Sequence, residues 1–331
     1  MTGRKPFSAD CLRLDCEQEV DKISRQLREM LTRRFKKQGL VVALSGGIDS
    51  SVVGELCVRA VGKARVFGLL LPEQDSSEAT RKLSRMFVDH LGITHDETDI
   101  TDVLKAVGCY HRRDEAIRQV IPEYGEGYTC KILLPSLLDS DSYRLFSVAV
   151  QAPDGTTRTE LLPPEAYTGI LSASNFKQRV RKMFEYYHAD RLNYAVAGTP
   201  NRLEYDQGFF VKLGDGAADT KPIAHLYKSQ VYQLAEYLGV PAEIRSRPPT
   251  TDTYSMPQSQ EEFYFSLPYD KMDLCLYGKN NGYSCEEVGT ASGLSAEQVQ
   301  RVFNDIDNKR RSTSYLQARP VLMESVPEIQ S

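Results

Sequence analysis

No apolar run of about 18 residues occurs in this 331-residue sequence, so we expect no membrane-spanning helix. Residues 1–11 also lack the apolar stretch of a secretory signal. The seven cysteines include no C-x-x-C pair, and none of the five histidines pairs at metal-ligand spacing. These absences argue against a disulfide framework and against a metal site built from cysteine or histidine. We therefore expect a reduced, cytoplasmic chain.

The sequence also has no basic excess, because its formal net charge is −4. Nucleic-acid-binding domains usually carry such an excess, so we expect no nucleic-acid partner. Hydrophobic residues make up 41% and charged residues 26% of the chain, which is ordinary for a globular protein. A chain of this length can bury a sizeable core, either as one large domain or as a domain with an appendage.

The most informative stretch begins with Leu40–Leu44, an apolar, β-branched run typical of a buried strand. The chain then turns through Ser45-Gly46-Gly47 and enters a helical apolar pattern that includes Val52 and Leu56. Two glycines allow a tight turn and a close ligand approach, and the amides of a helix start attract anions. The Walker sequence is absent. The stretch predicts a phosphate cradle of another type; the plain alternative is a strand–turn–helix with a glycine hinge and a serine cap.

Strand and helix patterns alternate around this turn. Residues 16–37 have the spacing of an amphipathic helix. Residues 65–71 read as a second buried strand, residues 76–91 as a helix and residues 93–100 as a third strand. This alternation predicts right-handed βαβ units and a parallel sheet. Ligands of such sheets bind beyond the carboxyl ends of the strands, which is where the glycine turn is expected.

The middle of the chain, residues 109–170, carries no readable catalytic pattern. Residues 143–150 alternate like a strand and residues 152–156 give a turn signal, so we expect a β-hairpin insertion. A helix is expected to begin at Ser174, a good N-cap, and to run to about Asn193.

A second strand-to-helix turn, Gly198–Glu204, follows a short predicted strand over residues 194–197. The loop Gly208–Asp219 then combines aspartates, glycines and one lysine, a composition that suits contacts with a polar ligand. Residues 226–238 predict a further helix, and the chain from Tyr269 onward is mostly helical.

Residues 283–311 permit a different interpretation, the helix-turn-helix of a nucleic-acid-binding regulator. Gly293 would form the turn and Ser295 would cap the second helix. Acidic side chains on this helix pair oppose binding to phosphates; they are Glu286, Glu287, Glu297 and Asp305.

A series of motifs carries a more specific signal. SGGIDSS stands at residues 45–51, N-x-K-x-R-x-R at 175–181, GTPNRLE at 198–204, GFFVKLGDGAAD at 208–219, P-I-x-x-L-Y-K at 222–228 and PPT at 248–250. In this order and spacing they resemble the ammonia-dependent catalytic domain of NAD synthetase, of the PP-loop ATP-pyrophosphatase superfamily.

The resemblance implies a Rossmann-like, doubly wound parallel sheet flanked by helices, as in adenine-nucleotide α-hydrolase-like folds. It implies one synthetase domain over residues 1–260, with the insertion at about 109–170. Residues 261–331 would form a helical extension of that domain with a flexible tail.

The implied reaction uses ATP as co-substrate and Mg²⁺. The carboxylate of deamido-NAD attacks the α-phosphorus of ATP, pyrophosphate leaves, and ammonia then displaces AMP to give NAD. No amidohydrolase-type domain is expected before the glycine turn, so ammonia would arrive free or from a separate ammonia-donating protein. The resemblance also implies a homodimer. The runner-up is another PP-loop amide-forming ligase that adenylates a different carboxylate.

The same resemblance implies roles for individual residues. Magnesium would bind Asp49 and Glu204, because carboxylates with phosphate oxygens suit a hard octahedral ion. The catalytic residues would be Asp49, Ser50 and Lys212. ATP would contact Leu44, Ser45, Gly46, Gly47, Ile48, Asp49, Ser50, Ser51, Thr199, Lys228 and Thr250. Deamido-NAD would contact Arg179, Arg181, Lys212, Asp219 and Lys309.

Several of these residues have plainer interpretations. Asp49 could be a carboxylate stabilised at a helix start, Glu204 could cap its turn, and Lys228 could be a solvated helix residue. Arg179 and Arg181 lie two positions apart on a helix, so we expect only one of them to face the ligand.

The predicted tail contacts have an alternative too. The basic run Lys309–Arg311 could be a solvated helix end favoured by the helix dipole. This chain also has Asn308-Lys309 where many relatives have His-Lys.

Overall fold

The computed structural model describes residues 7–134, 145–250 and 253–328. Its centre is a parallel sheet of β1 (Leu40–Ala43), β2 (Val66–Leu70), β3 (Thr94–Glu97) and β7 (Ala195–Ala197). The strand order is β3-β2-β1-β7, and Val41 of β1 pairs with Phe67 on one side and Val196 on the other. The predicted parallel sheet and its βαβ order are therefore confirmed.

Helices cover both faces of this sheet. Because side chains alternate along a strand, Leu40 and Val42 of β1 enter one core while Val41 enters the other. The helices packed around the first core are α1 (Cys16–Glu29), α2 (Ile48–Val61), α3 (Glu78–Leu91) and α8 (Lys228–Tyr237). The second core lies against α4 (Thr101–Ala106), α5 (Cys109–Arg118) and α6 (Pro164–Leu192). Burial on both faces explains the uninterrupted apolar runs of β1 and β2.

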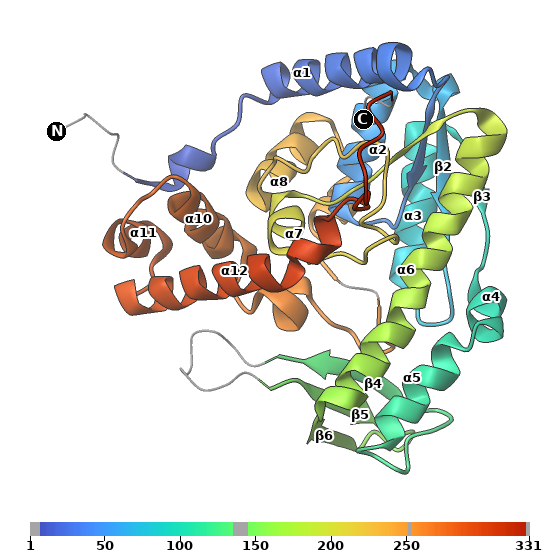
Figure 1. Ribbon diagram of the computed structural model, residues 1–331, viewed down its shortest axis with the longest axis vertical. Coiled ribbons are helices and arrows are strands. Elements are labelled where there is room, and N and C mark those ends of the chain that lie inside the picture. The colour runs from blue at the N-terminus through green and yellow to red at the C-terminus, as the bar shows by residue number, and fades with distance from the viewer. Residues whose placement is uncertain (1–6, 135–144, 251–252, 329–331) are drawn as a thin grey trace.

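The helix α6 corrects one prediction. It begins at Pro164, where a proline fits the first turn, rather than at Ser174. Ser174 lies inside the helix, and its hydroxyl donates to the Ile170 carbonyl at 2.8 Å. The early half of α6 packs on the insertion and the later half on the parallel sheet, so this helix joins the two (Figure 1).

The insertion is larger than the predicted hairpin. Its antiparallel sheet has the order β4-β5-β6, from β4 (Thr129–Leu133), β5 (Ser147–Gln151) and β6 (Thr157–Leu161). The hairpin β5–β6 is confirmed, and Gly155 takes the positive φ of 87° that its turn requires. The strand β4 was not predicted. Residues 143 and 144, where the first predicted strand would begin, lie outside the described residues.

The C-terminal helices build a core of their own, as the helical pattern from Tyr269 predicts. They are α10 (Tyr269–Asn280), α11 (Cys285–Ser292) and α12 (Ala296–Gln317), joined by α7 (Arg202–Gln207). The remaining described helical segments are Ala9–Leu12, Met30–Phe35, Lys63–Arg65, α9 (Ala242–Arg245) and Glu261–Phe265. In the described part of the chain, no helix has both the length and the apolar character needed to cross a membrane.

Candidate functional site

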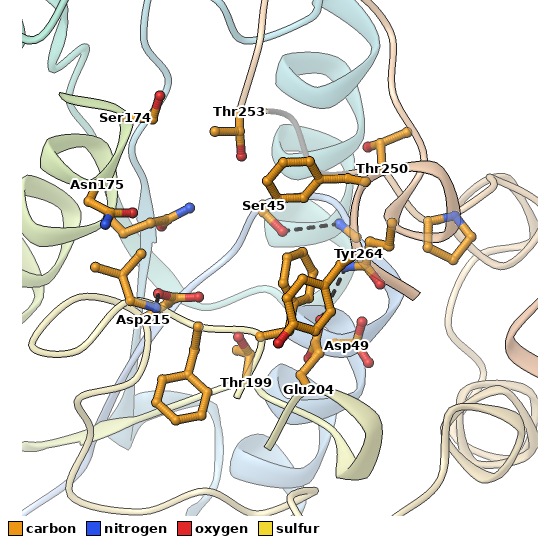
Figure 2. A pocket seen from close by; sticks show the side chains of 18 of the residues that line it. Ser45, Asp49, Ser174, Asn175, Thr199, Glu204, Asp215, Thr250, Thr253 and Tyr264 are labelled. Atoms are coloured by element: carbon orange, nitrogen blue, oxygen red, sulfur yellow. Dashed lines mark hydrogen bonds between the residues drawn. The ribbon is translucent and has the colours of Figure 1, made fainter. Parts of the chain in front are cut away.

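A cavity of about 1360 Å³ opens at the carboxyl ends of β1, β2 and β7. The helix α6 forms one wall, α12 forms part of another, and the insertion and the Pro248–Thr250 segment close further sides. Figure 2 shows Asp49, Glu204 and Thr199 on one side of the cavity, with Asn175 and Asp215 on the other. The position agrees with the ligand side expected for a parallel α/β sheet.

The glycine turn shapes the start of α2. Gly46 has a φ of +70°, and a Cβ there would lie 2.8 Å from the Ser84 amide nitrogen, so a larger residue does not fit. Ser50 Oγ donates to the Gly47 carbonyl at 3.0 Å and lies 3.2 Å from Ser45 Oγ. No side chain caps α2, so its first amide groups are available to an anion at the cavity floor.

Asp49 and Glu204 lie at the same end of the cavity and share one neighbour, Asn201. The Asn201 side chain donates to Asp49 Oδ1 at 3.1 Å, and the Asn201 backbone amide donates to Glu204 Oε2 at 3.0 Å. Lys228, which is 2% exposed, places its ammonium in contact with Asp49 Oδ2. Lys228 is therefore not a solvated helix residue, and Glu204 both caps α7 and faces the cavity.

The electrostatics of this carboxylate pair favour a cation. Burial, together with the nearby charge of Asp49, raises the pKa of Glu204 to about 8. Burial lowers the pKa of Lys228, but the Asp49 and Glu204 charges outweigh this and raise it overall. No group of three or more His, Cys, Asp or Glu side chains suited to a metal occurs among the described residues. A hard cation here would therefore need phosphate oxygens to complete its ligands.

The basic residues predicted to contact a dinucleotide also line the cavity. Lys212 Nζ donates to the Tyr315 carbonyl at 2.9 Å and lies 3.8 Å from the centre of the Tyr315 ring. Lys309 Nζ pairs with Asp305 at 2.7 Å and donates to the Tyr264 carbonyl at 2.8 Å. Lys309 is buried, so the alternative of a solvated helix end is wrong for this residue.

Arg179 and Arg181 both line the cavity, against the expectation that one would point away. Arg179 Nε donates to the Lys212 carbonyl and Arg181 Nε to the Leu71 carbonyl, each at 3.3 Å. Arg179 thus contacts the Gly208–Asp219 loop and Arg181 the segment after β2, and both segments contribute to the cavity lining.

The other predicted residues divide into those at the cavity and those away from it. Leu44, Ser45, Gly47, Ile48, Ser50, Thr199 and Thr250 line it. Gly46, Ser51 and Asp219 are not among its lining residues. Ser51 Oγ donates to the Gly47 carbonyl at 2.9 Å, and Asp219 accepts the Val196 amide at 2.7 Å, so both side chains bind backbone groups of the fold.

Several cavity residues were not among the predicted ligand contacts. Lys182 Nζ pairs with Glu185 at 2.6 Å, and Asp215 accepts the Val211 amide at 2.8 Å. Burial raises the pKa values of Glu185 and Asp215. Four polar residues of α6 recur three or four positions apart and so form a polar stripe along one helix face: Asn175, Gln178, Lys182 and Glu185. This spacing is the signal that could have identified the helix residues of the cavity.

A glycine turn at a helix start, with a partly buried carboxylate pair and a lysine at the open edge of a parallel sheet, defines a nucleotide-binding α/β protein. The family model described as NAD synthase matches residues 19–121 and 156–313. The chain belongs to the NAD synthase family.

A relative agrees with this assignment, and two solved structures share the fold. The NH(3)-dependent NAD(+) synthetase of Rhizobium meliloti (strain 1021) is 57% identical over 99% of this chain and 98% of its own length. A solved NMN synthetase from Francisella tularensis has a TM-score of 0.65 at 22% identity, covering 94% of this chain and 99% of that one. The NH3-dependent NAD synthetase from Campylobacter jejuni has a TM-score of 0.61 at 23% identity, covering 94% and 100%. At these identities the two structures support the fold alone.

Proposed function

We propose that this protein is a ligase that converts deamido-NAD to NAD with ATP and ammonia, releasing AMP and pyrophosphate. The observation that carries the proposal is the meeting of Asp49, Glu204 and Lys228 beside the Ser45–Ser51 turn in one cavity. This function is also supported by the name of a relative that is 57% identical over nearly the whole chain.

The reaction brings a carboxylate toward a polyanion, so negative charge must be neutralised as pyrophosphate leaves. Amide groups at the start of α2 would hold phosphate oxygens, with Ser45 and Ser50 as further donors. Lys228 would keep its charge beside Asp49 at neutral pH, since its pKa is raised. The arginines of α6 and Lys212 would hold the anionic acceptor.

The partly buried pair Asp49 and Glu204 fits a magnesium ion, because an added cation would offset the charge that raises the pKa of Glu204. These two carboxylates would hold the ion with ATP phosphate oxygens. When bound, it supplies charge neutralisation at the phosphates. Thr199 and Thr250 would contact ATP, and Lys309 and Asp219 would contact the dinucleotide.

The proposal includes a homodimer in a reducing, cytoplasmic compartment. The exposed apolar side chains of Met183 and Tyr187, one turn apart on α6, support a subunit contact on that helix. All seven cysteines are free, which supports a reducing compartment. Free ammonia, or ammonia from a separate protein, would serve as donor. Sedimentation of the purified chain tests the dimer.

The direct test is an assay of purified protein with ATP, Mg²⁺, ammonium and deamido-NAD. We expect equal amounts of AMP and NAD, and no ADP. Nicotinate mononucleotide offered in place of deamido-NAD tests whether a related carboxylate is preferred. Formation of ADP, or no turnover with deamido-NAD, would overturn the proposal.

A further inference from the structure

The insertion contributes a wall of the cavity that the family match does not cover. The matched residues are 19–121 and 156–313, so residues 122–155 lie between the matched parts. Leu134, after β4, and Phe146, before β5, nevertheless line the cavity. The Phe146 carbonyl accepts the Leu162 amide at 2.9 Å, which anchors this residue beside the end of β6.

Phe146 stacks on Tyr167, the cavity residue nearest the start of α6. Their ring centres are 4.1 Å apart and their planes differ by 15°, so the two rings lie face to face and each keeps one outer face for a further ring. Both rings line the cavity, and neither side chain is fully buried. Tyr254 and Phe263, in the same apolar cluster, also line it. This end of the cavity is therefore aromatic, in contrast to the charged end at Asp49 and Glu204.

The side chains along α6 change in character from this aromatic end toward the parallel sheet. Tyr167 and Leu171 come first, Asn175 and Gln178 follow, and Lys182 and Glu185 lie at the far end. At a rise of 1.5 Å per residue, Tyr167 and Glu185 are about 27 Å apart along the helix axis. Among the described residues, the side-chain amides of Asn175 and Gln178 have no hydrogen-bond partner.

We infer that Phe146 and Tyr167 form a stacking site for a heteroaromatic ring of a bound nucleotide. The side-chain amides of Asn175 and Gln178, about 12 and 17 Å farther along the helix axis, are available to other polar groups of the same ligand. Every such ring has a π-face that stacks on an aromatic side chain, and amide side chains pair with the polar donors and acceptors that a nucleotide carries beyond its base. A purely apolar ligand would leave the two amides unpaired.

The ring belongs to the acceptor. This assignment rests on the proposed function, which puts the ATP phosphates at the Ser45–Ser51 turn and further ATP contacts at Thr199, Lys228 and Thr250. Apart from Thr250, these contacts follow β1 and β7 or start α8, whereas Phe146 precedes β5 of the insertion and Tyr167 stands near the start of α6. Phe146 would thus be a specificity-determining residue supplied by the insertion.

The test measures KM for deamido-NAD and for ATP in full-length Phe146→Ala, Phe146→Leu and Phe146→Tyr variants. We expect Phe146→Ala and Phe146→Leu to raise the KM for deamido-NAD about tenfold, as the loss of one base–aromatic stack does. Phe146→Tyr keeps the ring and should remain close to the wild type. Leu145→Ala is the matched control, because Leu145 is 55% exposed and does not line the cavity.

The variants also distinguish the sources of the ring. A tenfold rise confined to ATP would support the stacking site but assign it to the ATP base. Unchanged KM values for both substrates in Phe146→Ala and Phe146→Leu would overturn the inference. If Phe146→Ala does not fold, the comparison of Phe146→Leu with Phe146→Tyr carries the test.

Failure of the proposed function would be seen separately, as absent turnover in the wild type. Calorimetric binding of ATP and of deamido-NAD to the wild type and to Phe146→Leu needs no turnover. Equal affinities of both proteins for both compounds would overturn the stacking site under that condition as well.

Discussion

The side chain of Asn201 donates a hydrogen bond of 3.1 Å to the carboxylate of Asp49, although 152 residues separate the two in sequence. Asn201 is also the N-cap of α7, where its Oδ1 accepts the Leu203 amide at 2.9 Å. One amide side chain thus fixes the start of α7 and orients the acidic residue at the start of α2. The two strand-to-helix turns behave as one structural unit.

Asp49→Asn should abolish adenylate formation while the protein stays folded. Asparagine has the same shape, but it removes the charge that balances Lys228 and the proposed magnesium ion. Loss of one well-placed electrostatic group typically costs about 100-fold or more in turnover. AMP release measures the activity, and circular dichroism checks the fold. Asp102→Asn, at a side chain that is 95% exposed, is the control. Near-normal turnover of Asp49→Asn would contradict the assignment.

Lys212→Ala should weaken the use of deamido-NAD more than the binding of ATP. Its ammonium contacts the Tyr315 ring and the carbonyl groups of Tyr315 and Ala318 at the end of α12, and none of its contacts is with Asp49, Glu204 or Lys228. KM values for the two substrates, measured separately, test this. Lys279→Ala serves as control, since Lys279 pairs with Asp307 away from the cavity lining. An equal rise in KM for both substrates would instead assign Lys212 to the ATP-binding part of the site.

Lys177→Met should destabilise the fold strongly. Lys177 Nζ pairs with Glu73 at 2.9 Å and Asp75 at 2.6 Å, and it donates to the Thr253 carbonyl at 2.7 Å. Although burial opposes it, the charges of Lys177 and Arg113 hold the pKa of Asp75 below its ordinary value. Removal of one partner from such a buried network costs about 3–5 kcal/mol of unfolding free energy.

Urea unfolding of Lys177→Met and of Lys105→Met provides the comparison. Lys105 pairs with the exposed Asp102, so its loss should change the unfolding free energy by no more than about 0.5 kcal/mol. If the two variants unfold alike, the buried network does not hold the β2–α3 connection in place.

Asp273 should make the protein more stable as the pH falls toward 4. Burial raises its pKa to about 6, even though it accepts the Lys228 and Ser229 amides at the start of α8. The folded state binds this proton more tightly than the unfolded state does. Between the unfolded pKa of about 4 and the folded value, the contribution of Asp273 to the free energy of unfolding therefore falls as pH rises. From about pH 7 to pH 4, protonation of Asp273 adds about 2 kcal/mol to the free energy of unfolding.

Unfolding free energies of the wild type and Asp273→Asn across this pH range test the claim. The free energy of unfolding of the wild type should rise relative to that of the variant as pH falls, because asparagine does not titrate. A constant difference between the two proteins would show that Asp273 does not bind its proton more tightly when folded.

The sequence by itself determined the elements whose signals are local. The apolar runs of β1 and β2, the amphipathic patterns of α1 and α3 and the glycine turn at Ser45–Gly47 each lie within a few residues, and period and turn chemistry predict them. The resemblance to NAD synthetase rested on motifs of the same short range. The prediction failed at Ser174, because tertiary packing against the insertion extends α6 beyond a good local cap.

Only the tertiary structure decided which distant residues meet. Three features depend on how strands and helices pack: the contacts of Asp49 with Asn201 and Lys228, the presence of both Arg179 and Arg181 in the cavity lining, and the hydrogen bond that Asp219 accepts from the Val196 amide. So does the aromatic wall that Phe146 adds. Hydrophobic periodicity specifies which face of an element is buried, but not which partner buries it, and side-chain contacts across the cavity follow from the partner.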